Sequence, residues 1–331
     1  MPASKQPWLI RRDYATNSNE GPWLTNPKQP LEGFSRIFGP ERTPRYARTR
    51  LGLTMVADQL AKGPFSRQAA QDMLFNDRNL FGEQWRDRLA AFCRQTPLMI
   101  DLTFTITDVR EACGVIARWD KTMNLDSKGA VFSHRFLDNV LANIEVITAT
   151  IGQPSPDFYA KGFDVTDPVG TPAGLNTGAF LVPIALARTV NDFRWVGLPL
   201  DTTLRQSSYS PYGGKKTPIH GGASENGMFN AIDMNWRNTG YEMGSGSDDI
   251  GRESDGGASF VMVTSFTGGC VDDRSLLLGS ERSGKSGWPL ATGQLELYAN
   301  KQWVDPPFCD DEIAGAGVRS VTELGPGGPG R

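Results

Sequence analysis

The chain has few of the residues that most often hold metal ions. It contains only two histidines, His134 and His220, and four cysteines that form no Cys-x-x-Cys pair. Two imidazoles exclude a histidine-rich metal centre, and the cysteine spacing excludes zinc ribbons and thioredoxin-type sites. Cys93 and Cys113 could form a disulfide, because each lies at or inside a predicted helix. Two free buried cysteines are an equally good interpretation.

Long apolar runs and an excess of one charge are also missing. No stretch approaches the roughly 18 apolar residues of a membrane span, and residues 1–6 lack the apolar region of a secretory signal. The net charge is −3 and basic residues are spread among acidic ones, so neither nucleic acid nor an anionic membrane is a favoured partner. With 331 residues, 39% of them hydrophobic, the chain can still bury a sizeable core.

The first half of the chain has the apolar periodicity of helices. Alternating apolar and polar residues predict a short strand at 102–107, and Asp108 to Glu111 form a predicted capping box for the helix that follows. The Pro-rich residues 153–156 mark a predicted seam. Helices are predicted at residues 45–61, after Ser66, at 82–93, from the capping box to residue 119, and at 133–147 and 173–191.

The composition changes after residue 191. Gly, Ser, Tyr and Asn dominate residues 207–257, which is typical of turns and strands rather than helices. Residues 258–266 form the strongest predicted strand, with residues 274–278 as a possible hairpin partner, and a short helix is predicted at 292–301. A helical block followed by a β-rich block predicts an α+β fold.

Residues 279–286 match the phosphate-loop pattern G-x-x-x-x-G-K-[ST]. A phosphate loop must open a helix, so that backbone N–H groups face the anion. Here Gly287, Trp288 and Pro289 follow, and no later strand ends in an acidic Mg²⁺ ligand. The pattern therefore favours a basic Gly-Ser surface loop over a nucleotide site.

Two further groups suggest chemistry but have simpler explanations. Asp120, Asn124 and Asp126 are spaced wrongly for an EF-hand loop, and no Glu closes it, so they fit a turn after a helix better. The imidazole of His220 could be a general base. No Ser or Cys in a nucleophile-elbow context accompanies it, so a structural histidine at a glycine turn is favoured.

The strongest functional signal is the segment of residues 17–27, Asn-Ser-Asn-Glu-Gly-Pro-Trp-Leu-Thr-Asn-Pro. Paired asparagines beside a Trp-Pro loop pack poorly, because their amides require partners. The amide NH₂ of Asn19, aimed into a cleft, can donate to the oxygen that becomes negative during acyl transfer. A loop-capping asparagine is the alternative, and the surrounding residues favour the functional interpretation.

This segment resembles the N-x-N-D-x-x-W-L-T-N-P stretch in the β-chain of the penicillin acylase family, in its acyl-homoserine-lactone and aculeacin-type branch. The resemblance extends from about residue 8 to residue 313, and five further phrases occur in the family's order. These phrases are residues 30–34, 45–50, 113–120, 259–263 and 294–308.

The resemblance implies the four-layer αββα sandwich of an N-terminal-nucleophile hydrolase. In that family a precursor cuts itself into α- and β-chains, and the new N-terminal Ser of the β-chain uses its own α-amine as base. The expected organisation is a partial sandwich with a helical block. Its parts are an oxyanion-loop segment at 1–44, a mainly helical block at 45–191, a β-rich part at 192–313 and a disordered tail at 314–331.

The resemblance also implies roles for individual residues. The family's oxyanion hole pairs a backbone N–H with an asparagine side chain, for which Asn19 is the best match and Asn17 the second. An arginine supports the site, and spacing does not separate Arg48 from Arg50. The acyl pocket would be lined by Trp23, Phe34 and Phe38.

Parts of the family pattern are missing. The N-terminal Ser, the strands after it and the whole α-chain are expected on another polypeptide, and Ser4, behind Met1-Pro2-Ala3, is not expected to replace the nucleophile. The family's S-Q-S-x-x-P-x-S-P-H-Y-x-D-Q segment is replaced by residues 280–294. No Asp between residues 21 and 39 matches the calcium ligand of some relatives, so neither a metal nor another cofactor is expected.

The sequence thus predicts the C-terminal part of an acylase β-subunit that hydrolyses the linear amide of a small acyl substrate. Its partners would be the missing α-chain and the N-terminal portion of the β-chain. The alternative is a non-catalytic split or decayed acylase half, which the altered residues 280–294 favour slightly. By resemblance the compartment is periplasmic or extracellular, although the chain shows no signal sequence of its own.

Overall fold

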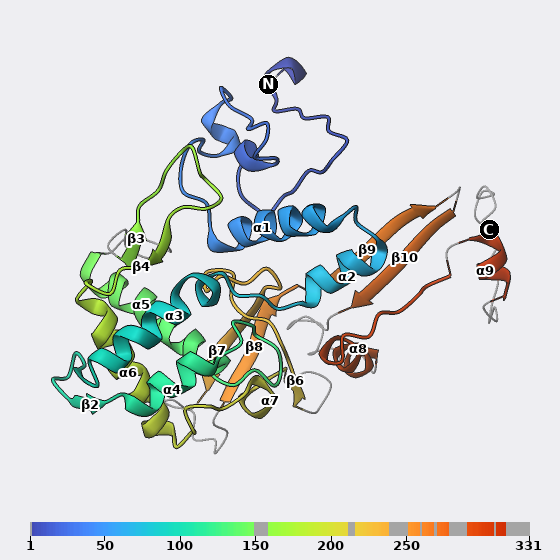
Figure 1. The fold of residues 1–331 in the computed structure, drawn as a ribbon. Helices are drawn as coiled ribbons and strands as arrows, with labels where there is room; N and C mark the ends of the chain where they lie inside the picture. Colours follow the sequence, from blue (N-terminus) through green and yellow to red (C-terminus); the bar gives the residue numbers. More distant parts are fainter. Residues whose placement is uncertain are drawn as a thin grey trace, which may run out of the picture.

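The computed structural model of the chain describes residues 2–148, 158–210, 216–237, 251–258, 260–267, 270–277, 290–307 and 309–315. Figure 1 shows an N-terminal segment of loops and short turns, a block of helices, and strands that follow toward the C-terminus. Helix α1 (Ala47–Lys62) lies between the N-terminal segment and the helical block. The mixture of helices and small sheets confirms the predicted α+β class.

The helices begin where local capping favours them. The hydroxyl of Ser66 accepts a hydrogen bond from Ala69 N, and the side chain of Asn79 accepts one from Gly82 N at 2.7 Å. Most of the predicted helices are confirmed, with ends that differ by a few residues. The helices after α1 are α2 (Arg67–Phe75), α3 (Leu80–Gln95), α4 (Arg110–Arg118), α5 (Ala130–Thr148), α6 (Leu181–Val196), α7 (Leu204–Ser207), α8 (Leu290–Ala299) and α9 (Asp310–Gly315).

The predicted strand at 102–107 is wrong. Strands β1 (Leu98–Ile100) and β2 (Ile106–Asp108) pair antiparallel, and the residues between them form a turn. The turn forms because the Asp101 carboxylate accepts hydrogen bonds from the backbone N–H groups of Thr103 and Thr105. Side-chain bonding of this kind competes with an extended strand.

Two other local predictions need correction. The capping box at 108–111 does not form, because the Asp108 carboxylate accepts hydrogen bonds from the backbone and side chain of Arg110 instead. The helix predicted at 173–191 begins only at Leu181. Its first predicted residues form β4 (Ala173–Leu175), which pairs with β3 (Tyr159–Lys161), and Gly174 adopts a positive φ of 68° that a helix excludes.

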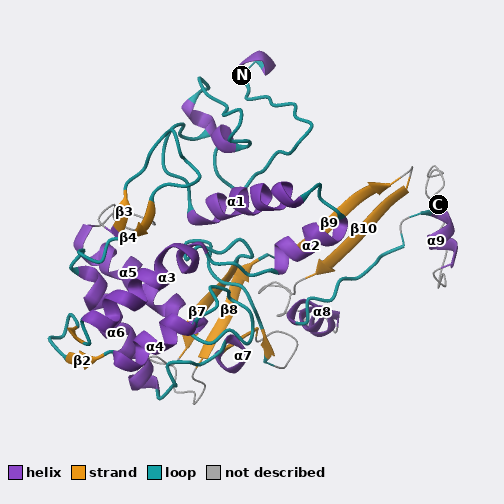
Figure 2. Ribbon diagram, in the orientation of Figure 1, coloured by secondary structure: helices purple, strands orange, loops and turns teal. Residues whose placement is uncertain are grey.

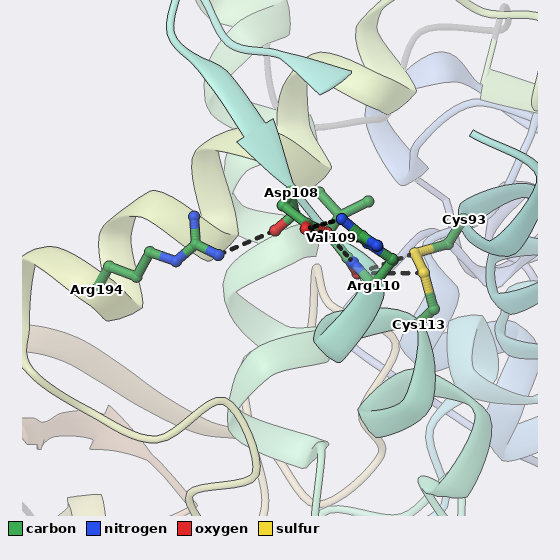
Figure 3. The surroundings of a disulfide bond; sticks show 6 residues. All are labelled: Cys93, Asp108, Val109, Arg110, Cys113 and Arg194. Carbon is green, nitrogen blue, oxygen red and sulfur yellow. Dashed lines mark hydrogen bonds and ion pairs between the residues drawn. A yellow bond between two sulfur atoms is a disulfide. The ribbon is translucent and has the colours of Figure 1, made fainter. Parts of the chain in front are cut away.

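The main hydrophobic core lies within the helical block. A disulfide within this core links two of its helices. Leu51, Trp85, Phe132 and Leu186 are among its fully buried side chains. Cys93 of α3 and Cys113 of α4 are bonded with their Cα atoms 5.4 Å apart, so the disulfide interpretation holds and the two-thiol alternative does not. Figure 3 shows this bond beside the end of β2, where α6 is tied to β2 by Arg194, which donates to the Asp108 carbonyl.

The larger sheets follow the helical block, as Figure 2 shows. A four-stranded sheet has the order β6-β5-β8-β7, in which only β5 and β8 are parallel. The predicted hairpin at 258–278 is confirmed, because β9 and β10 pair antiparallel from Phe260 opposite Leu277 to Thr267 opposite Cys270. The strands are β5 (Ser208–Ser210), β6 (Thr217–Pro218), β7 (Ile232–Arg237), β8 (Gly251–Gly257), β9 (Phe260–Thr267) and β10 (Cys270–Leu277).

Several predictions concern residues outside the described ranges. They are the seam at 153–156, the phosphate-loop string at 279–286 and the tail from residue 316 onward. The predicted start of the disordered tail at residue 314 is wrong, because residues 314 and 315 belong to α9 (Asp310–Gly315). Within the described ranges, no helix combines the length and the apolarity that a membrane crossing requires.

Candidate functional site

The paired asparagines lie against the start of α1. A single terminal nitrogen of Arg48 donates to the side-chain oxygen of Asn19 at 2.5 Å and to the Ser18 carbonyl at 2.6 Å. A guanidinium only donates hydrogen bonds, so the Asn19 oxygen must face Arg48 and the NH₂ group must point the other way. Within the described part of the chain, that NH₂ group donates to no protein atom.

Asn17 shapes the loop around Asn19. Its side-chain oxygen accepts a hydrogen bond from Asn19 N at 2.8 Å. Asn19 itself has a φ of 63°, a left-handed conformation that asparagine tolerates better than most residues. Asn17 therefore holds the backbone that presents Asn19.

Asn19 and Arg48 form part of the wall of a cavity of about 540 Å³. Part of the wall is polar and part is apolar, so one region can bind an amide while another contacts a hydrocarbon group. The polar wall comprises Asn19, Arg48, Ser224, Asn230 and Asp233. The remaining wall comprises Leu74, Phe75, Phe229, Ala231, Gly257, Ala258, Phe260 and Val261.

The structure brings Arg48, and not Arg50, to Asn19. Two positions along a helix correspond to a rotation of about 200°, so the two side chains leave opposite sides of α1. Arg50 is 1% exposed and its Nε donates to the Val169 carbonyl at 2.9 Å. Burial lowers the pKa of Arg50 from its ordinary value.

The aromatic residues predicted for the acyl pocket do not line this cavity. Trp23 is buried with Leu24 and Leu53, and its indole N–H donates to Glu32 at 2.8 Å. Neither Phe34 nor Phe38 contributes to the cavity wall around Asn19. These three residues pack or shape the N-terminal segment.

The cavity takes its aromatic side chains from three other elements. Phe75 ends α2, Phe229 precedes β7 and Phe260 begins β9. Phe260 belongs to the family-like phrase at residues 259–263, so the sequence offered a signal that could have marked it as a site residue. Neither Phe75 nor Phe229 is singled out by any motif, because they reach the cavity through chain folding alone.

His220 lies in a buried polar network behind the cavity. Its Nδ1 is 2.8 Å from an Asp77 carboxylate oxygen and its Nε2 is 3.0 Å from the Tyr298 carbonyl. Asn230, which reaches the cavity wall, donates to Asp77 and to the Tyr298 hydroxyl. Both imidazole nitrogens are occupied, so the structural interpretation of His220 agrees with these contacts. Burial also raises the pKa of Tyr298 well above its ordinary value.

The acidic residues considered for calcium have separate partners. Asp120 accepts hydrogen bonds from Thr122 and Ser127, and the Asp126 carboxylate pairs with Arg205. The side-chain oxygen of Asn124 accepts a hydrogen bond from the Lys301 ammonium. These contacts fit the turn interpretation. Across the described residues, no group of three or more His, Cys, Asp or Glu side chains has an arrangement that could hold a metal ion.

Comparison with known proteins identifies related sequences along nearly the whole chain. Residues 1–315 match the sequence model of the penicillin amidase family. Aculeacin-A acylase of Actinoplanes utahensis is 34% identical over 319 residues, which cover 93% of this chain and 36% of that protein. The acyl-homoserine lactone acylase PvdQ of Pseudomonas syringae pv. syringae is 27% identical over 316 residues, covering 94% of this chain and 37% of that protein.

A second PvdQ, from Pseudomonas fluorescens strain Pf-5, is 28% identical over 320 residues and is covered to the same extent, 37%. The chain therefore spans little more than a third of the length of the curated relatives that it matches. Nearly two thirds of each relative lies outside the region matched by this chain.

Proposed function

Because this chain belongs to the penicillin amidase family, we propose that it is part of an acylase in which Asn19 stabilises the oxyanion formed during amide hydrolysis. The observation that carries this proposal is the orientation of the Asn19 amide. Arg48 holds its oxygen, so the NH₂ group is free to donate to another acceptor at the cavity. The positive charge on Arg48 also polarises the amide, which makes its N–H bonds better donors to a developing negative charge.

We place the nucleophile on a segment outside this chain. In the family resemblance that nucleophile is an N-terminal Ser whose own amine is the base. Ser4 is a poor substitute, because it lies in the exposed 3₁₀ turn Ala3–Lys5 and does not contribute to the cavity wall. The matched relatives are nearly three times as long as this chain, which leaves ample sequence for such a segment.

The substrate class follows from the cavity and from the relatives. The relatives are named as acylases of aculeacin A and of acyl-homoserine lactones. In this chain Phe75, Phe229 and Phe260 provide an apolar wall beside the amide-binding groups. We therefore propose a linear amide with an apolar acyl group as substrate, cleaved to a carboxylic acid and an amine.

The compartment is proposed to be periplasmic or extracellular. Disulfides such as Cys93–Cys113 persist in oxidising environments and are rare in the reducing cytosol. The proposed partners are the remaining acylase segments, which would complete an αββα sandwich around Asn19.

The proposal is tested by assembling the chain with a separately expressed segment that carries the N-terminal Ser, and assaying a chromogenic acyl amide. Asn19→Ala removes one oxyanion donor and should lower kcat by about 10²–10³ fold. Asn300→Ala is the matched control, because Asn300 is exposed and its side chain, within the described part of the chain, donates to the Glu296 carbonyl of its own helix end. Unchanged kcat in Asn19→Ala would exclude the oxyanion role. A folded assembly without any activity would favour the alternative, a non-catalytic acylase half.

A further inference from the structure

We propose that Glu20 is a positioning residue that fixes the Asn19 amide in its donating orientation. The inference rests on the proposed function of Asn19 and assigns a role to Glu20, which stands at the Asp position of the family-like phrase. Glu20 follows Asn19 directly, so any displacement of its carboxylate moves the asparagine as well. Its role would be exerted through Asn19, without contact with the substrate.

The carboxylate of Glu20 is held by the first turn of α1. One oxygen accepts hydrogen bonds from the Thr49 hydroxyl at 2.5 Å and from Tyr46 N at 3.1 Å. The other lies 3.5 Å from the Arg45 guanidinium, and the Glu20 side chain is only 9% exposed. A carboxylate is well placed at this helix end, because it satisfies a backbone N–H group and meets the positive end of the helix dipole.

The same helical turn that holds Glu20 also holds Asn19. Arg45 directly precedes the cap of α1 and Thr49 lies in the first turn of the helix, and both contact the Glu20 carboxylate. Arg48, one position before Thr49, reaches the Ser18 carbonyl and the Asn19 side chain. The two sets of contacts therefore set one register between the loop and the helix. If Glu20 lost its contacts with Arg45, Tyr46 and Thr49, only the hydrogen bonds of Arg48 would align Asn19 with α1.

The backbone on either side of Asn19 has little room to adjust. Gly21 packs so closely that a Cβ added there would lie 2.7 Å from the Phe38 carbonyl oxygen. On the other side, Asn17 holds Asn19 N, and Asn19 keeps a left-handed φ. Such a conformation persists when its surroundings hold it. Glu20 lies between these two constraints and supplies the contacts to α1.

Glu41 provides a matched control within the same N-terminal segment. Its carboxylate accepts hydrogen bonds from Gly33 N and Phe34 N, both at 2.8 Å. It holds a neighbouring turn in the same chemical manner, and among the described residues it accepts no hydrogen bond from Asn19 or from the start of α1. A purely structural effect of losing a carboxylate clamp should therefore be common to Glu20→Gln and Glu41→Gln, whereas an effect on Asn19 should be specific to Glu20→Gln.

The experiment uses the chain with ¹⁵N-labelled asparagine, and the Asn19 amide signals are assigned by their loss in Asn19→Ala. Glu20→Gln should shift or broaden the backbone and side-chain signals of Asn19, while Glu41→Gln should leave them in place. Thr49→Val, which removes one donor to Glu20, should move the same signals in the same direction. If Glu20→Gln fails to fold, Thr49→Val still tests whether the contacts of Glu20 position Asn19.

In the assembled acylase, Glu20→Gln should lower kcat at least about tenfold while KM changes less than about twofold, since the lost interaction acts in the transition state. Unmoved Asn19 signals in both Glu20→Gln and Thr49→Val would overturn the positioning role, whatever happens to the melting temperature. Moved signals together with full activity in Asn19→Ala would instead overturn the proposed function and leave the positioning of Asn19 by Glu20 intact.

Discussion

At the scale of single residues, burial sets the ionisation of the groups beside α1. Tyr159 packs edge-on against Trp85 with ring centroids 5.7 Å apart. Burial disfavours its charged form and raises its pKa to about 12, although the nearby positive charge of Arg50 opposes the shift. The hydroxyl of Tyr159 therefore stays neutral at pH values where an exposed tyrosine has lost its proton.

This shift predicts a loss of stability at alkaline pH. Between pH 10 and pH 12 the unfolded chain loses the Tyr159 proton while the folded chain keeps it, so the free energy of unfolding falls as pH rises, by about 2–3 kcal/mol in total. Urea unfolding at a series of pH values measures it. Tyr159→Phe should flatten the profile in this window, and Tyr46→Phe, at an exposed tyrosine, should not. Identical profiles in wild type and Tyr159→Phe would contradict the prediction.

At the scale of elements, the disulfide fixes the geometry of α3, the β1–β2 hairpin and α4. The bond closes a segment with a sequence separation of 20 residues, and both sulfur-bearing side chains are buried in the main core. The hairpin inside this segment presents Leu98, Ile100 and Ile106 to the surface. Its two strands are only three residues long each, so covalent closure is a substantial part of what holds the segment together.

Replacing both Cys93 and Cys113 with Ala should lower the free energy of unfolding by about 3 kcal/mol, chiefly because the unfolded chain regains the freedom of an open loop. Equilibrium denaturation in urea gives the difference directly. Helix content measured by circular dichroism should be unchanged in the folded variant, because the buried faces of α3 and α4 stay packed in the main core. A decrease in the free energy of unfolding of less than about 1 kcal/mol would contradict the prediction that closing this loop stabilises the fold by restricting the unfolded chain.

At the scale of the whole molecule, the β9–β10 hairpin leaves an apolar face uncovered within the described structure. Val261 and Val263 are buried on the side where α2 and α8 contact the hairpin. The alternate residues of β9 are exposed: Phe260 by 53%, Met262 by 51% and Phe266 by 81%. One face covered by helices and one bare apolar face suit a sheet that packs against another layer.

This face predicts self-association of the isolated chain. Sedimentation velocity at increasing concentration should show oligomers, and the double variant Met262→Ser, Phe266→Ser should shift the distribution toward monomer, because less apolar surface is gained by contact. Trp8→Ser is the control, since Trp8 is 77% exposed in the N-terminal segment. A wild-type chain that stays monomeric at every concentration would show that this face needs no cover.

Predictions from sequence succeeded where a pattern is local. The helix after Ser66, the apolar periodicity of α1 and the strand-forming residues of β9 each report a structure formed by neighbouring residues. They failed where a side chain competes with the backbone hydrogen bonds of a strand or a helix cap. The Asp101 carboxylate accepts hydrogen bonds from the backbone of a turn, and the Asp108 carboxylate accepts them from Arg110. Phe75 and Phe229 of the cavity wall carried no sequence signal.

The sequence alone determined the family of this chain, its α+β class and the segment that carries Asn19, because these depend on residue order and on short-range periodicity. It left Arg48 and Arg50 as equal candidates for the arginine beside Asn19. Only the tertiary structure decided which of the two meets Asn19, 29 residues away, and that Phe75, Phe229 and Phe260 meet at its cavity. Contacts between distant segments depend on how whole elements pack, and no local pattern records that packing.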